Sequence, residues 1–275
     1  MDWSRAKSIL ILVFVIVNIF LVANIGVFNL RSSISGETIS NAKTVLKERG
    51  ITLKCELPRF GSDTGMMQFD NAADRKREII GKLLGNIDKP VESIKFGEEL
   101  VKGSKNLVFE SNGDFIYKDQ SPSGSVNLTS KNEIEKLVRD SLQGTGLPLG
   151  KYIVDDFWLV SDKEAIIIFR EKYKSFIVYD NYIGAWVSKE GITHLECRFK
   201  EVRGLTQKNK IIPAHVILLR NMEKGSGTVI LGIDIGFRNK SDRSTKDLYS
   251  SPAWRVTTDD NVITYFNAYT GEVIK

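Results

Sequence analysis

The chain has 275 residues, of which 42% are hydrophobic and 27% are charged, a composition that excludes a disordered or fibrous protein. Its formal net charge of +5 is spread along the chain without a cluster of Lys and Arg, which argues against nucleic-acid binding. The two cysteines, Cys55 and Cys197, lie in no C-x-x-C motif. They either pair on an oxidising outer face or stay unpaired as small hydrophobes.

An uncharged apolar run at residues 9–28 predicts a transmembrane helix, since about 20 helical residues span a bilayer core. The preceding segment 1–8 carries Arg5 and Lys7, so we expect it to form a cytoplasmic tail with the rest of the chain outside. The alternative is a cleaved signal peptide. The run is long for one, and Ala23 lacks a small residue two places before it.

Two amides inside this run indicate helix–helix pairing. Helical spacing places Phe14, Asn18, Leu21 and Ile25 on one face, with Asn24 about a third of a turn away from Asn18. Amides in hydrocarbon form interhelical hydrogen bonds that contribute about 0.6–2 kcal/mol. These five residues are the predicted partner-binding site. The alternative is that Asn18 bonds only its own backbone.

The segment 29–37 reads as a linker, and an extracytoplasmic domain of α+β class is expected beyond it. We divide this domain into a first lobe at 38–124 and a second at 125–275, with the loop 120–125 at the boundary. Helix followed by sheet occurs in each, so the prediction is two related lobes of helix plus antiparallel sheet, similar to PepSY domains.

In the first lobe, the apolar spacing and turn residues predict four elements in chain order. They are a helix with Ile39, Ala42, Val45 and Leu46 on one face that ends at Gly50, a strand at 52–60, a helix at 71–84 with Asp70 as N-cap, and a hairpin of strands 106–110 and 115–118 around Asn112-Gly113.

The second lobe begins with a helix whose capping box is formed by Ser130 and Glu133. Aromatic and β-branched runs then predict strands, and Pro213 is expected in the first turn of one short helix that reaches about Met222. The expected strands are 152–160, 165–173, 176–179, 185–188, 193–202, 228–237 and a last hairpin of 254–257 and 262–268.

The sequence offers no convergent catalytic groups. His194-Leu-Glu196 echoes the H-x-E of zinc deaminases, but the P-C-x-x-C that this site requires is missing. His215 falls in a short apolar helix. The acidic pairs at 155–156 and 259–260 are expected in solvated turns where strands end. We therefore predict no catalytic residue, no metal and no cofactor.

Both ends of the chain resemble the YycI (WalI) family. The opening MDWSRAKSI followed by NIFL at 18–21 is similar to the start of that family, and 233–237 (IDIGF), 252–256 (PAWRV) and 267–272 (NAYTGE) are similar to the closing strands of the YycH/YycI domain. The resemblance implies a non-enzymatic accessory regulator of the YycFG (WalRK) two-component system of low-GC Gram-positive bacteria, which controls cell-wall metabolism.

The resemblance also implies the partners. A YycH-like protein and the sensor histidine kinase YycG (WalK) are expected to contact the chain, in part through membrane helices. Two other readings stay open from the residues alone: an anchored PepSY-like module that binds a wall polymer or inhibits a protease, and an anchored wall enzyme.

Overall fold

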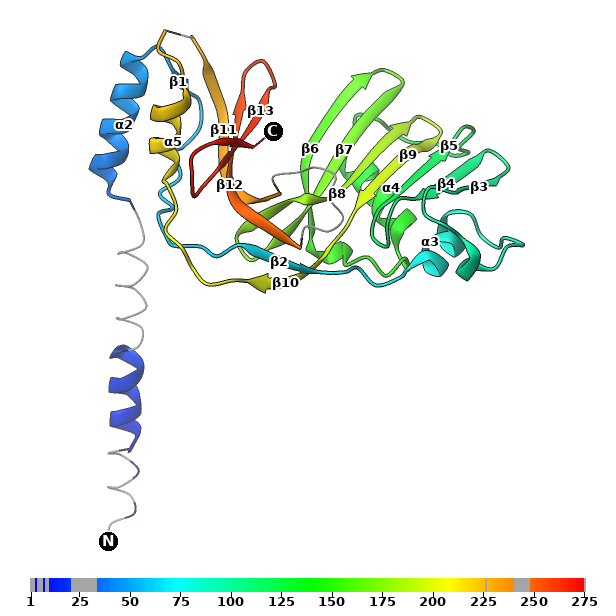
Figure 1. Cartoon of the computed structure of the whole chain (residues 1–275), viewed down its shortest axis with the longest axis horizontal. Coiled ribbons are helices and arrows are strands. Elements are labelled where there is room, and N and C mark those ends of the chain that lie inside the picture. The colour runs from blue at the N-terminus through cyan, green and yellow to red at the C-terminus, as the bar shows by residue number, and fades with distance from the viewer. Residues whose placement is uncertain are drawn as a thin grey trace.

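The computed structural model describes Trp3, Lys7 and residues 10–20, 34–225, 227–239 and 248–274 (Figure 1). Residues 10–20 are helical. The other helices and helical turns follow in chain order: α2 (Gly36–Glu48), α3 (Lys76–Leu83), η1 (Val91–Ser93), α4 (Lys131–Leu142), η2 (Leu149–Lys151) and α5 (Ala214–Asn221).

In the described part of the chain more residues lie in strands than in helices, and all of the strands connect into one hydrogen-bonded sheet. They are β1 (Thr52–Leu53), β2 (Met67–Asp70), β3 (Glu99–Lys102), β4 (Lys105–Phe109), β5 (Phe115–Asp119), β6 (Tyr152–Ser161), β7 (Glu164–Tyr173), β8 (Phe176–Ser188), β9 (Gly191–Arg198), β10 (Glu201–Leu205), β11 (Val229–Arg238), β12 (Tyr249–Thr258), β13 (Ile263–Asn267) and β14 (Val273–Ile274).

The sheet has two halves that meet at β8. We call residues 71–199 the α4 half; its strands pair in the antiparallel order β6-β7-β8-β9-β5-β4-β3. We call residues 34–70 and 200–274 the α2 half; here β11, β12, β13 and β14 form an antiparallel sheet, and β1 joins β11 in parallel. The two segments that connect the halves form the ribbon β2–β10, which runs along the lower edge of the sheet in Figure 1. The α4 half is therefore inserted into the α2 half.

Each half has its own core. In the α4 half, α3 and α4 cover one face of the strands, and 26 buried side chains from 79–199 form the largest apolar cluster. In the α2 half, α2 and α5 lie side by side against β11 and β12 (Figure 1). Leu46, Leu218 and Trp254 are buried in the core of this half. A smaller cluster of Met67, Phe69, Phe176, Val178 and Phe237 joins the two halves. The α4-half core takes residues from both sides of the predicted lobe boundary at 124–125. The division into lobes 38–124 and 125–275 remains a prediction.

The cap of α4 forms as the sequence predicts, because Ser130 accepts a hydrogen bond from the Glu133 backbone amide. Ser35, which was expected in the linker, also caps a helix, since it accepts a hydrogen bond from the Thr38 backbone amide at the start of α2. The Glu133 carboxylate accepts from the Asn127 amide at 3.1 Å, so only one arm of the predicted capping box forms.

Other boundaries were wrong. The strand expected at 52–60 is only Thr52–Leu53, because the chain then leaves the sheet for the ribbon. The helix expected at 71–84 begins at Lys76, and Asp70 lies at the end of β2 opposite Glu201 instead of capping the helix. Pro213 is the N-cap of α5 and lies just before its first turn, not within it. The strands expected at 176–179 and 185–188 are one bent strand, β8.

The predicted transmembrane helix is described only in part. Of residues 9–28, the structure describes 10–20, and Leu21, Asn24 and Ile25 lie outside the described residues. Within the described part of the chain, no helix is both long enough and apolar enough to cross a bilayer.

Candidate functional site: the N-terminal helix and the Arg255 cluster

Two of the five predicted partner-binding residues, Phe14 and Asn18, lie in the described part of the N-terminal helix. Phe14 is 69% exposed, and the Asn18 side-chain amide donates to the Phe14 carbonyl at 2.8 Å. The Asn18 side chain thus bonds the backbone of its own helix, as one of the two alternatives expected. An amide has two N–H donors and one acceptor, so this bond leaves capacity for a second one.

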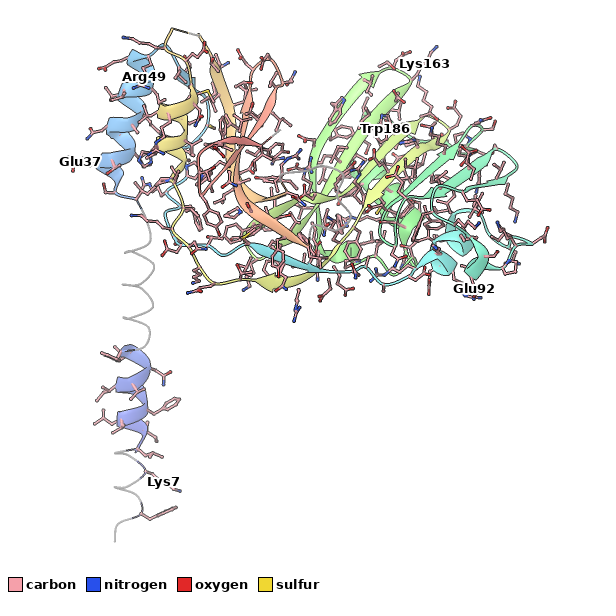
Figure 2. The ribbon with its side chains drawn as sticks, in the orientation of Figure 1. Lys7, Glu37, Arg49, Glu92, Lys163 and Trp186 are labelled. Carbon is pink, nitrogen blue, oxygen red and sulfur yellow. The ribbon has the colours of Figure 1, made fainter. Side chains whose placement is uncertain are left out.

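The histidines and cysteines have structural surroundings. The ring of His194 packs edge-on against Trp186, which Figure 2 labels on the sheet, and Glu196 accepts a hydrogen bond from Tyr182. His215 is buried in α5, where burial lowers its pKa. Cys55 and Cys197 are both free thiols. Among the residues that the structure describes, no three His, Cys, Asp or Glu side chains gather as metal ligands.

The most highly connected polar group lies where the halves meet. We call Asp155, Arg170, Tyr179, Asp234 and Arg255 the Arg255 cluster. The Arg255 guanidinium binds both oxygens of Asp155, with Nη2–Oδ1 at 2.8 Å, and reaches Asp234 Oδ2 at 2.8 Å. Arg170 Nε donates to the same Asp155 at 2.7 Å, and the Tyr179 hydroxyl donates to Asp234.

The cluster joins strands that are far apart in sequence. Asp155 and Arg170 come from the β6–β7 pair of the α4 half, and Asp234 and Arg255 come from the β11–β12 pair of the α2 half. Tyr179 of β8 lies between them, with its ring centroid 5.1 Å from the Arg255 guanidinium carbon. The cluster is therefore an ionic contact between the two halves.

Burial sets the electrostatics of the cluster. The Asp155 side chain is 5% exposed and that of Arg255 9%. Burial alone would raise the pKa of Asp155, but the hydrogen bond and charge of Arg255 lower it overall. Burial alone would lower the pKa of Arg255, but Asp155 and Asp234 raise it overall. Next to them, burial and the charge of Asp155 raise the pKa of Asp156. Both members of the central pair therefore stay charged at neutral pH.

Beside the cluster, β8 is bent. Neighbouring residues of β7, Arg170 and Glu171, pair with Tyr182 and Val178, so residues 179–181 have no partner on β7. Pairing with β9 begins at Tyr182 and pairing with β11 ends at Val178, so these three residues also lack a partner on the other side. An unpaired insertion of this kind bends a strand.

Each residue of the bend makes side-chain hydrogen bonds. Besides Tyr179, Asp180 accepts from the Asn239 amide at 2.7 Å and from the Ser250 hydroxyl at 2.9 Å. Asn181 donates to Glu171 at 2.6 Å and accepts from the Lys200 amide at 2.9 Å. The three side chains thus contact both halves, while the backbone of the bend has no ladder partner on β7, β9 or β11.

Sequence reasoning missed this cluster. The pair at 155–156 was expected in a solvated turn, which was wrong, because both residues lie inside β6 and Asp155 is buried. The one signal in the sequence was two carboxylates within an otherwise apolar strand. The partner Arg255 is 100 residues away, and no local pattern connects the two. The second pair is placed as expected: Asp260 accepts from the Val262 amide in the exposed turn after β12.

Comparison with curated proteins finds no match. Comparison with protein families matches residues 30–269 to the family model "YycI protein", which covers both halves of the sheet and the Arg255 cluster. Membership in this family implies a membrane-associated regulator with an accessory role in the YycG two-component system. With so much of its length matched, the chain belongs to the YycI family.

Proposed function

We propose that this chain is a non-enzymatic regulator of the sensor histidine kinase YycG, that it acts together with a YycH-like protein, and that its N-terminal helix contacts the membrane helices of the kinase. In this proposal residues 9–28 cross the membrane with the N-terminus in the cytoplasm. The face that contacts the partner carries Phe14, Asn18, Leu21 and Ile25, with Asn24 beside it.

The observation that carries the proposal is the firm attachment of α2, which begins at Gly36 and includes the last two residues of the predicted linker 29–37. Ile39, Ala42 and Leu46 of α2 are buried against the core that α5 completes. At its end, Arg49 Nη1 donates to the Leu219 carbonyl at 2.6 Å. Because α2 is packed into the α2 half, a reorientation of that half moves the chain that enters α2. An outer domain so attached is suited to tilting or rotating a membrane helix.

Regulation of this kind needs no catalysis. A kinase that alternates between two states is shifted by any contact that differs between them, by an amount equal to the difference in contact free energy. A changed helix contact worth about 1.4 kcal/mol shifts such an equilibrium about tenfold. The range expected for one interhelical amide bond, roughly 0.6–2 kcal/mol, is therefore sufficient.

The test replaces Asn18 and Asn24 by Leu in the full-length chain. We expect weaker cross-linking to the kinase helices and altered phosphorylation of the response regulator, because the amide bonds are lost. Ile16→Leu, a change at another position of the same helix, is the matched control and should leave both readouts unchanged.

Two outcomes would contradict the proposal. Unchanged cross-linking and phosphorylation in the double variant would remove the helix contact. Full regulatory activity of residues 34–275 released from the N-terminal segment would favour the alternative of an anchored binding module that works through its outer domain alone.

A further inference from the structure

We propose that the Asp155–Arg255 ion pair of the Arg255 cluster is a clasp that holds the two halves of the outer domain in one of two arrangements, and that the bend in β8 at residues 179–181 is the hinge about which they swing when the clasp opens. The hinge is a property of the outer domain, and its existence does not depend on the kinase contact proposed above. Its regulatory use rests on that contact.

The β8–β11 pairing at the base of the junction is the part that stays closed, and we call it the pivot. Among the described residues two pairs join β8 to β11, Ile177 with Gly236 and Val178 with Phe237. The small apolar cluster around Phe176 and Phe237 surrounds this point, with the two rings 5.2 Å apart. Separating these apolar side chains would expose them to water, which is unfavourable, so this cluster remains closed.

The hinge residues are those that the ladder leaves unpaired. Among the residues that the structure describes, none pairs as a strand with residues 179–181 of β8, so a change in their backbone angles breaks no ladder hydrogen bond there. Hinges in proteins are a few such residues at which pairing is interrupted. The second connection, the ribbon β2–β10, also has a register shift, between Val202 and Gly204. Both connections between the halves therefore contain an irregularity.

The clasp is made of charge, which makes it easier to open than an apolar contact. Separating Asp155 from Arg255 exposes ions that water solvates well, whereas separating apolar surfaces gains nothing from water. Water reaches the cluster from the side of Asp234, whose side chain is 40% exposed. Opening also leaves Asp155 with a partner, because Arg170 belongs to the same half.

The geometry gives the motion a direction. The tip of the β6–β7 pair, marked by Lys163 in Figure 2, and the turn between β12 and β13 stand on opposite sides of the junction. With the pivot at the base, loss of the Asp155–Arg255 contact separates these two tips. Since α2 and α5 pack on β11 and β12, the same swing turns α2 relative to the α4 half.

The experiment measures the distance between the two tips by pulsed electron paramagnetic resonance on the full-length protein in lipid nanodiscs. Spin labels are introduced as genetically encoded residues at Lys163 and Asp259, both exposed, so the native thiols stay in place. The variants are Asp155→Asn and Arg255→Met. Arg77→Met is the matched control, because Arg77 pairs with Glu92 in an exposed contact remote from the junction.

We expect one narrow distance in the unaltered protein and in the control, and a second, longer distance in both clasp variants. Identical distance distributions in all four proteins would overturn the proposal, as would a longer population of equal size in the control. Near-ultraviolet circular dichroism checks that each variant is folded. If Arg255→Met does not fold, Arg255→Lys replaces it; it keeps the charge but loses the two-pronged contact, and it too should show the longer population.

Discussion

Gly236 of β11 is a position where one added methyl group should disturb the junction between the halves. A Cβ atom there would lie far inside contact distance of the Ile177 carbonyl oxygen and 2.7 Å from the Tyr179 ring. The oxygen is backbone, so the strands themselves must move apart. Overpacking of this kind costs about 1–3 kcal/mol. Losing the hydrogen bonds of the two-residue β8–β11 pairing adds about 1 kcal/mol per bond. We therefore expect Gly236→Ala to lower the free energy of unfolding by about 2–4 kcal/mol.

The assay is urea unfolding of the full-length protein in detergent micelles, followed by tryptophan fluorescence, since Trp254 is fully buried in the adjacent β12. Gly232→Ala is the matched control. It lies on the same face of the same strand, and its added Cβ would find only Thr257, at 3.9 Å. We expect a change within about 0.5 kcal/mol there. Equal unfolding free energies for the two variants would refute the close approach of β8 and β11.

Three further changes test other parts of the fold. Leu46→Ala should cost about 2–5 kcal/mol, because Leu46 is fully buried between α2 and its neighbours; thermal unfolding measures it, and a shift below about 1 °C would contradict the packing. Ser130→Ala should cost about 1 kcal/mol through loss of the α4 cap, with Ser130→Asp as a control that retains it. Burial raises the pKa of Asp180 despite hydrogen bonds from Asn239 and Ser250, so stability should fall as the pH rises from about 4 through the folded-state pKa. Asp180→Asn should remove that part of the fall, and an unchanged pH dependence of the unfolding free energy would refute this.

Elements with a local signal were predictable from the sequence. The turn at Asn112-Gly113 joins β4 and β5 as expected, and α4 begins after Ser130 as its cap residue indicates. These features depend on residues within a few positions of one another, so the sequence shows them directly. The mixed α+β class follows from them.

The features that required distant partners were not predictable. The strand β2 has four residues, and it exists because β10 and β12 pair with it from far along the chain. β8 looked like two strands, at 176–179 and 185–188, because the polar residues Asp180 and Asn181 break the apolar pattern; both lie in the bend. The candidate residues of the N-terminal helix came from a strong local pattern, and their predicted partner belongs to another molecule. They remain predictions.

The insertion of the α4 half has a consequence for the order in which the chain folds. Thr52 of β1 pairs with Val229 of β11, so β1, which is synthesised early, can pair only after β11 has been synthesised. Residues 71–199 form a contiguous stretch with its own core and are complete much earlier. Once this stretch is folded, the pairing of Asp70 with Glu201 brings its ends together. The long loop that separates β1 from β11 then behaves as a short one, and the entropy cost of closing it falls. Folding of the inserted half therefore lowers the entropy cost of folding the half that surrounds it.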